Sequence, residues 1–425
     1  MYRFISFLGI VILLLFAWLL SPHKKNINWR LITWGFALQI VFALFIFVLP
    51  AGARVFIAVN DMAVNVLEAA KAGAEFVFGK LAVPPGSNKE SIGHILAFQA
   101  FPTIIFFSAV MSILYFLKII PLVIRGFAFV FTKLMRISGA ESLLAASNIF
   151  VGIESAFTIK PYLKDMTHSE LFTVLTLGMS TVASNVLAIY IFTLKGYFPM
   201  IAGHLVSASF LSAPAALIIS KLLMPETGSP KTLGQNVKPY YEKEDNMFSA
   251  IINGANSGVK LIVGIVALLI AVISLVELLD MLLGWVGGWF GMQELSLKVI
   301  LGYVFYPFTV ILGVPVEDAG HISKIIGERL VVTEITAYQD LASLIDKGGI
   351  QHQRSIIITT YALCGFAHFA SMAIFIGGIS ALVPKRTNEL ARLGLRALVA
   401  ATLACLITGC IAGIFAGGDT ILFSG

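Results

Sequence analysis

Two glutamates, Glu154 and Glu334, lie within long apolar stretches of this 425-residue sequence. A carboxylate at membrane depth is costly unless it faces a cavity or a partner, so an intramembrane glutamate marks a functional position by default. The pair can accept hydrogen bonds from the hydroxyl or amide groups of a polar solute. The alternative role is structural, with each carboxylate closing a hairpin tip through an internal hydrogen bond.

A lone histidine, His368, interrupts a later apolar run together with Gly365, Phe366 and Ser371. Such a histidine is usually a satisfied core residue, but its small and polar neighbours favour a place in the same site as Glu334. Histidine is the residue type that changes charge near neutral pH, which makes His368 the candidate for a proton step.

Oxygen-bearing groups surround the first glutamate. Asn148 and Val151 precede it, and Thr181 and Val182 lie in a polar break of the following apolar run. Carbonyls and hydroxyls exposed at a helix break are the usual ligands of Na⁺, so these four residues predict a sodium site. The alternative is that the hydroxyls bond back to their own helix.

The composition defines the surroundings of these residues. Hydrophobic residues make up 58% of the chain and charged residues 12%, which excludes a soluble globular protein and a disordered one. Continuously apolar runs also exclude an outer-membrane barrel. The sequence therefore predicts an all-α polytopic membrane protein. The net charge of +6 is attributed to basic cytoplasmic loops rather than to nucleic-acid binding.

Eight apolar runs are long enough to cross a bilayer. They cover residues 4–20, 31–50, 97–117, 170–194, 198–224, 257–283, 355–382 and 393–416. Residues 55–82 are amphipathic and predict an interfacial helix. Two interrupted stretches, 138–165 and 312–346, are typical of re-entrant hairpins, which occur at membrane depth only where they pack in protein or line a cavity.

The basic loops indicate the orientation of these segments. The positive-inside rule places both termini outside and lets the two hairpins enter from opposite sides. Opposed hairpins, each followed by a span with a polar break, predict the inverted repeat of a secondary transporter with its site at the midplane. Four parts result, namely scaffold spans 1 to 3 (1–117), a first transport repeat (118–224), a cytoplasmic linker with span 6 (225–295) and a second transport repeat (296–425).

Two other classes of protein, a passive channel and an intramembrane hydrolase, fit the sequence less well. A passive channel favours rings of like residues around a pore rather than two opposed hairpins. An intramembrane hydrolase using Glu154, Glu334 or His368 needs a nucleophile or metal ligands nearby, and none occurs at workable spacing. The three cysteines lie in apolar runs and indicate packing residues rather than a disulfide or a metal site. No enzymatic activity is predicted.

Several short motifs follow one another along nearly the whole chain. They are Ala146-Ser147-Asn148-Ile149-Phe150-Val151-Gly152, Ile159-Lys160-Pro161-Tyr162-Leu163, Gly313-Val314-Pro315, Cys364-Gly365-Phe366-Ala367 and Pro384-Lys385-Arg386. Together they resemble the concentrative nucleoside transporters. The resemblance implies a homotrimer whose protomers have eight spans and two opposed hairpins, divided between a scaffold and a mobile transport domain.

The resemblance also implies roles for individual residues. The first hairpin tip, with Ile153, Glu154 and Ser155, faces the nucleobase beside Val186 and Val259. The ribose is bound by Glu334, Phe366 and Ser371, with His368 in the same site. Na⁺ is held by carbonyls of Asn148, Val151 and Val182 and the hydroxyl of Thr181.

Three departures from the family pattern concern the solute. Gly152-Ile153-Glu154 lacks the glutamine usual at the first tip, Thr333 and Ile335 flank Glu334 in place of asparagine and phenylalanine, and His368 replaces an asparagine. Loss of a polar group that pairs with a substrate changes discrimination by orders of magnitude. The expected function is nucleoside import across the cytoplasmic membrane by elevator-type symport with Na⁺. The alternative is proton-coupled uptake of a related solute.

Overall fold

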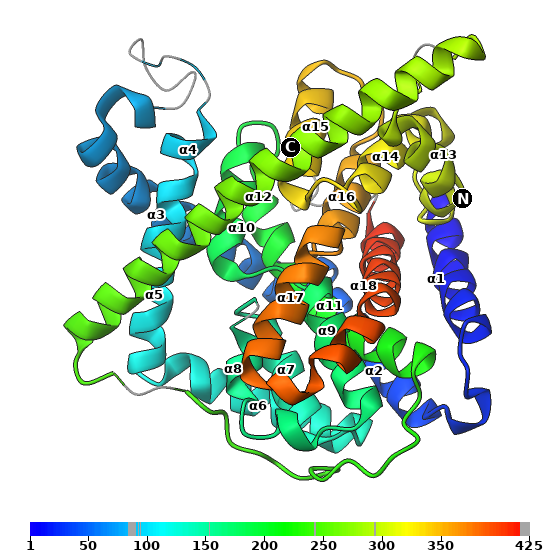
Figure 1. The fold of residues 1–425 in the computed structure, drawn as a ribbon. Coiled ribbons are helices and arrows are strands. Elements are labelled where there is room, and N and C mark those ends of the chain that lie inside the picture. The colour runs from blue at the N-terminus through cyan, green and yellow to red at the C-terminus, as the bar shows by residue number, and fades with distance from the viewer. Residues whose placement is uncertain are drawn as a thin grey trace.

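The computed structural model describes residues 1–83, 91, 93, 95–152, 154–241, 244–292 and 295–416. Over these ranges every regular element is a helix, and the one β-type pairing is an isolated bridge between Ser138 and Leu233. The prediction of an all-α fold is confirmed (Figure 1). Within the described ranges six helices are long and apolar enough to cross a membrane.

The first part of the chain forms mostly long helices. They are α1 (Tyr2–Leu19), α2 (Trp29–Phe47), α3 (Pro50–Phe78), the short α4 (Leu96–Gln99) and α5 (Phe101–Phe116). α3 corresponds to the predicted interfacial helix, and it begins at a proline, whose missing N–H is not needed in the first turn of a helix.

A block of six helices follows, and its plan occurs again later in the chain. The first block has α6 (Ile119–Met135), α7 (Gly139–Asn148), α8 (Ser155–Thr158), α9 (His168–Ser180), α10 (Ser184–Leu194) and α11 (Ile201–Leu223). The second has α13 (Leu297–Ile311), α14 (Val316–Glu328), α15 (Glu334–Asp346), α16 (Gln353–Leu363), α17 (Phe369–Leu382) and α18 (Thr387–Phe415). In each block a helical hairpin precedes a broken helix and then a long unbroken one, as the predicted repeat requires.

The broken helices coincide with the polar breaks seen in the sequence. The run 170–194 divides into α9 and α10, and the run 355–382 divides into α16 and α17. The hairpins α7–α8 and α14–α15 lie within the predicted stretches 138–165 and 312–346. The second block begins with helix α13, which was not predicted from the sequence.

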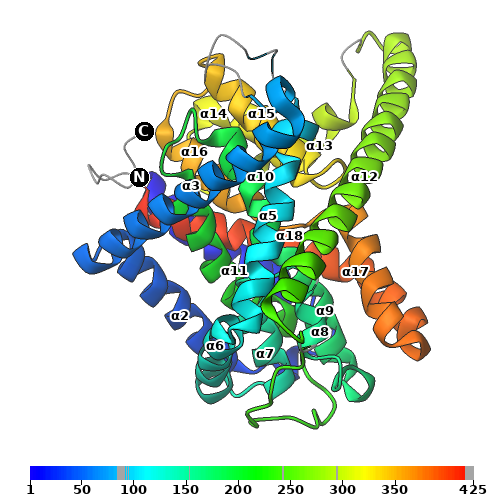
Figure 2. The same ribbon diagram turned by 90° about the vertical axis from the view of Figure 1, so that its left-hand side faces the viewer.

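The core and the periphery are composed of different helices. Buried residues make up 89% of the apolar window of α11 and 83% of that of α18, whereas the figure is 6% for α12 (Met247–Trp289). α18 packs against α1, α9, α11 and α16. The lime helix α12 crosses the molecule diagonally in Figure 1 and lies beside α5 in Figure 2, away from this core.

Candidate solute and ion site

The first helix break is produced by local backbone signals. α9 starts with a capping box, in which Thr167 and Glu170 satisfy each other's backbone N–H groups. The helix ends at Ser180 because Thr181 and Ala183 both adopt extended conformations, and α10 begins at the next residue. Two helix ends therefore point into the protein interior with carbonyl and N–H groups that the break leaves unpaired.

The second break is capped by the histidine itself. His368 is the N-cap of α17, and its Nδ1 accepts a hydrogen bond from the Ser371 backbone N–H at 3.2 Å. The Ser371 hydroxyl bonds back to the carbonyls of Phe366 and His368. The Ser371 hydroxyl is thus bonded within the turn, and these bonds fix the geometry of the break.

The two breaks lie against each other. A Cβ at Gly365 would fall 2.8 Å from the Ser180 carbonyl oxygen and 2.5 Å from the Cys405 sulfur, so only glycine fits between them. At the first hairpin tip, a Cβ at Gly152 would fall 2.6 Å from the Cβ of Ala183. The hairpin and both breaks are therefore in close contact, which brings the two repeats to one place.

A cavity of about 100 Å³ lies at this junction. Its lining includes six of the predicted solute residues, from both repeats, namely Glu154, Val186, Glu334, Phe366, His368 and Ser371. Helix α12 forms a further wall, through Leu261, Ile265, Leu268 and Leu269. The resemblance placed Val259 of this span beside the base, but these four residues were not predicted, because apolar residues on a span carry no sign of what they face.

Glu334 is the best-supported group of the cavity. It is 2% exposed and occupies the first turn of α15, where the helix dipole favours a negative charge. The Tyr190 hydroxyl donates to Oε1 at 2.6 Å, and the Tyr190 ring packs on Tyr338 with 4.6 Å between centroids. Tyr190 was not predicted, since a tyrosine in an apolar span has no distinguishing neighbours.

The cap at His368 also decides which ring nitrogen is the acceptor. A backbone N–H can only donate, so Nδ1 accepts from Ser371. The other ring nitrogen, Nε2, lies 2.8 Å from Oε2 of Glu334. The ring therefore connects the cap of α17 to the carboxylate.

Glu154 has a different environment from Glu334. It is exposed, and it lines both the central cavity and a second cavity of about 430 Å³. Tyr115, Phe157 and Tyr240 line the second cavity on the side of the predicted cytoplasmic linker. Glu154 is thus the residue shared by the two cavities.

The predicted ion ligands meet between hairpin 1 and the first break. Asn148 and Thr181 are fully buried, and the Thr181 Oγ1 lies 3.1 Å from Asn148 Oδ1 and 3.0 Å from the Leu177 carbonyl oxygen. Val182 is buried beside them and Val151 is half-buried at the hairpin tip. The side chains of Asn148 and Thr181 are therefore brought together as predicted.

Two predicted solute residues, Ser155 and Val259, are not part of the cavity lining, and a third, Ile153, lies outside the described residues. Ser155 is buried at the start of α8, and Val259 is 45% exposed on α12, to one side of the cavity wall. The resemblance suggested that Ser155 and Val259 lie in the site, but their side chains do not line the cavity.

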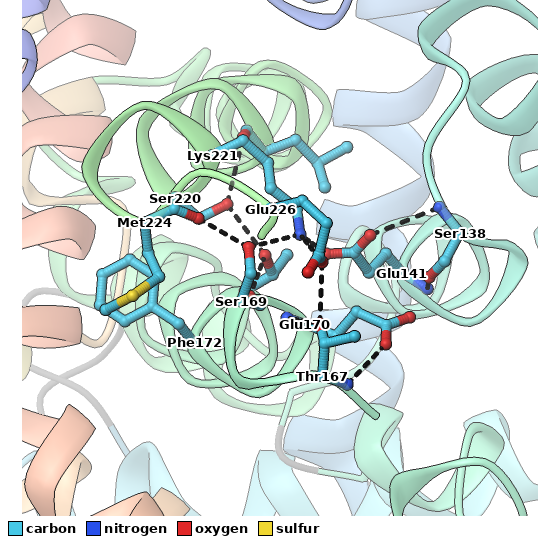
Figure 3. A network of polar contacts seen from close by, with 12 residues as sticks. Ser138, Glu141, Thr167, Ser169, Glu170, Phe172, Ser220, Lys221, Met224 and Glu226 are labelled. Atoms are coloured by element: carbon cyan, nitrogen blue, oxygen red, sulfur yellow. Dashed lines mark hydrogen bonds and ion pairs between the residues drawn. The ribbon is translucent and has the colours of Figure 1, made fainter. Parts of the chain in front are cut away.

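A buried ionic network lies away from the cavity, at the far end of hairpin 1 (Figure 3). The Lys221 ammonium, with its side chain 7% exposed, pairs with Glu141 at 2.5 Å and Glu226 at 3.4 Å and donates to the Ser169 hydroxyl at 2.8 Å. Its members join α7, α9, α11 and the linker. Lys221 was not predicted to be important, although a lysine within an apolar run is rare enough to have indicated a buried ion pair.

Paired hairpins, paired broken helices and a polar site between them are the marks of a secondary transporter. The descriptions of the family models that match the chain agree with this class. "Na⁺ dependent nucleoside transporter N-terminus" matches residues 8–81, "Nucleoside recognition" matches 97–197, and "Na⁺ dependent nucleoside transporter C-terminus" matches 204–413.

Curated relatives match over nearly the whole chain. An uncharacterized transporter of Haemophilus influenzae is 39% identical, with 97% of each chain covered. Solute carrier family 28 member 3 of Mus musculus is 38% identical over 96% of this chain, and sodium/nucleoside cotransporter 1 of Rattus norvegicus is 36% identical over 97%. The chain spans 58% of the mouse protein and 64% of the rat protein.

Solved structures give the same result. CNTnw in an inward-facing, substrate-bound state matches with a TM-score of 0.90 and 34% identity, covering 99% of this chain and 100% of that one. A double variant of CNTnw in an outward-facing state also has a TM-score of 0.90, at 34% identity and 99% coverage of each chain. The chain belongs to the concentrative, Na⁺-dependent nucleoside transporter family, and it is a multi-pass membrane transporter rather than an enzyme.

Proposed function

We propose that this protein imports a nucleoside across the cytoplasmic membrane by symport with Na⁺, and that the solute binds in the cavity between the two repeats. The observation that carries the proposal is the Glu334 carboxylate, held by Tyr190 from one repeat and flanked by His368 from its own. A carboxylate has about four acceptor positions. Tyr190 uses one of them, His368 lies 2.8 Å from the other oxygen, and the remaining positions suit the hydroxyl groups of a sugar.

The rest of the cavity suits a planar base. Ala183, Val186 and Leu261 provide apolar walls, and Phe366 adds an aromatic ring. Glu154 supplies an acceptor for the amino or imide N–H of a base at the border with the second cavity. Burial of the base among apolar groups gives affinity, and the two carboxylates fix its orientation.

Na⁺ is the favoured coupling ion because of the oxygens around Thr181. The Thr181 hydroxyl has one proton for two acceptors, the Asn148 Oδ1 and the Leu177 carbonyl. A hard cation at this position would satisfy the excess of acceptors. Carbonyls of Val151 and Val182 complete the proposed ligand set.

Three further features belong to the same proposal. The hairpins and broken helices form the mobile transport domain of an elevator-type carrier. The apolar surface of α12, mostly exposed in one protomer, is covered by lipid and by neighbouring copies in a homotrimer. Both termini lie outside the cytoplasm, as the basic loops indicate.

Uptake by the full chain in proteoliposomes tests the proposal. A set of radiolabelled nucleosides and nucleobases is offered under an inward Na⁺ gradient, a proton gradient or neither, at a clamped membrane potential. Nucleoside accumulation with the Na⁺ gradient alone is expected. Accumulation with the proton gradient alone would instead establish the proton-coupled alternative, for which the contact of His368 with Glu334 is the supporting observation. Absence of uptake in all conditions would contradict the substrate class.

A further inference from the structure

The second cavity, of about 430 Å³, is larger than the central one and lies beside hairpin 1. Its volume is within the usual range of small-molecule sites. Three segments enclose it, namely the end of α5, the α8 arm of hairpin 1 and the linker that precedes α12. It borders the central cavity at Glu154, which lines both. A solute that passes Glu154 from the central cavity therefore enters this second cavity.

The walls of the second cavity are mostly aromatic. All three segments contribute rings, which are those of Tyr115, Phe116, Phe157, Tyr240 and Tyr241. Phe157 is 46% exposed and Tyr240 is 37% exposed, so both rings have surface that is open to a ligand. A nucleobase stacks favourably on such rings whatever its identity, because every base has a π-face. The walls therefore suit a planar aromatic solute.

The charged groups of the lining favour an uncharged solute. Glu154 and Glu244 contribute two carboxylates, and Lys118 contributes one ammonium group. Both oxygens of Glu244 accept from the Asn253 amide, at 3.1 and 2.9 Å, which holds this carboxylate near the start of α12. Carboxylates accept hydrogen bonds from base N–H and sugar hydroxyl groups, and they repel a phosphate. The lining thus favours a nucleoside over a nucleotide.

The linker wall of the cavity is fastened to hairpin 1. The Tyr240 backbone N–H donates to the Thr158 carbonyl at 2.9 Å. The Tyr162 hydroxyl donates to the Lys238 carbonyl at 3.3 Å. The Lys160 ammonium lies 5.5 Å from the centre of the Tyr240 ring. These contacts hold the Tyr240 ring at the cavity, so this wall is formed before a solute arrives, and little ordering is needed for binding.

We propose that the second cavity is a separate, weaker binding site for the transported nucleoside, whose base stacks on the rings of Phe157 and Tyr240. The inference rests on the proposed function, because its ligand is the solute of the central cavity. The second site is the weaker one because its walls are more exposed than Glu334, and water competes for the same hydrogen bonds. Since the linker forms one wall, the site holds the solute on its way to the cytoplasm.

Equilibrium dialysis of the purified full-length protein in detergent tests the second site. The probes are radiolabelled uridine, cytidine, adenosine, guanosine and inosine. Wild-type protein is expected to bind two molecules of a transported nucleoside per protomer, with dissociation constants that differ by about tenfold or more. Tyr240→Ala is expected to lose the weaker site and keep the tighter one, because a stacking ring is removed. Tyr240→Phe keeps the ring and is expected to keep both sites.

Other variants and one competitor separate the two sites. Glu334→Gln is expected to weaken the tighter site and leave the other unchanged. Phe157→Ala, on the hairpin wall, is expected to weaken the second site by about tenfold or more. Tyr303→Ala is the matched control, since its ring is 78% exposed on α13 and is outside the lining of both cavities. Uridine monophosphate is expected not to compete at the weaker site.

The outcomes distinguish this inference from the function it rests on. Wild-type protein that binds one nucleoside per protomer overturns the second site and leaves the proposed transport intact. A folded Tyr240→Ala or Phe157→Ala protein with an unchanged weaker site also overturns it, and if one variant does not fold the other decides. Competition by uridine monophosphate overturns the preference for an uncharged solute. Wild-type protein that binds none of the nucleosides contradicts the proposed function and this inference together.

Discussion

The two hairpin tips follow one plan but treat their polar groups differently. In the second repeat, Glu334 is buried between Tyr190 and His368, and the Arg329 guanidinium donates to the Ala362 carbonyl at the end of α16. In the first repeat, Glu154 is exposed between two cavities, and the side chains of Asn148 and Thr181 meet at the helix ends. The polar groups of the second tip therefore have partners within the protein, whereas those of the first are the ones proposed to bind an ion and a solute.

The hairpins also differ in how they are anchored to neighbouring segments. Hairpin 1 is fastened near the start of α7 by Lys221, a buried cation with Glu141 and Glu226 around it. Hairpin 2 is fastened by Lys298, whose side chain is 37% exposed and pairs with Glu328, at the end of α14, at 2.5 Å and with Asp340. Removing one partner of a buried ion pair strands the other charge, while a partly exposed pair contributes less. Hairpin 1, which contains the proposed ion ligand Asn148, is thus expected to have the stronger anchor.

The largest expected effect is a loss of stability, which tests this difference in anchoring. Lys221→Met is expected to destabilise the protein by about 3 kcal/mol, because Glu141 remains buried without its partner. Lys298→Met is the matched control, with an expected cost below about 1 kcal/mol. Thermal unfolding of both variants in detergent measures the effect. Equal losses in melting temperature would show that the two anchors are equivalent.

Glu334→Gln is expected to have the second-largest effect, a loss of uptake efficiency. The amide keeps the size of the side chain but replaces a carboxylate oxygen with a donor, so that it conflicts with the Tyr190 hydroxyl or with His368. Loss of a charged hydrogen-bond acceptor costs about 2 to 3 kcal/mol, which corresponds to about a 100-fold fall in uptake efficiency. Initial uptake rates measure it, with Val259→Ala as a control expected to keep wild-type rates. Near-normal transport by Glu334→Gln would remove this carboxylate from the site.

Glu154→Gln is expected to have a smaller effect, about a tenfold loss of uptake efficiency. The carboxylate is exposed to the second cavity, where water weakens its interaction with the solute. Initial rates with several nucleosides measure the loss, and the ranking of nucleosides is expected to change because Glu154 faces the base in the proposed pose. A loss as large as that of Glu334→Gln would remove the contrast between the two tips.

Local signals in the sequence were enough to locate the hairpins and the breaks. Polar and small residues in apolar runs marked 180–185 and 365–371. α9 ends and α10 begins within the first stretch, and α16 ends just before the second, in which α17 begins. The reason is that breaks follow from local conformational preferences and capping residues, such as the N-cap at His368. Glu154, Glu334 and His368 were recognisable for a related reason, since polar residues in membrane segments are rare.

Contacts between distant segments were not recognisable in this way. Tyr190 is 144 residues from Glu334, and Lys221 is 80 residues from Glu141 in the chain. The α12 wall of the cavity and the guanidinium at the end of α16 likewise depend on which helix packs beside which. No local pattern distinguishes these residues from others of their type.

The sequence by itself determined the environment, the all-helical class, the position of each hairpin and break, and the two glutamates, because these depend on composition and short-range preference. Only the tertiary structure decided which partners each glutamate has. It buried Glu334 against Tyr190 and His368, exposed Glu154 between two cavities, and turned Val259 away from both. Packing of the two repeats against each other fixes these environments, and side-chain direction at a packed surface depends on every neighbouring helix.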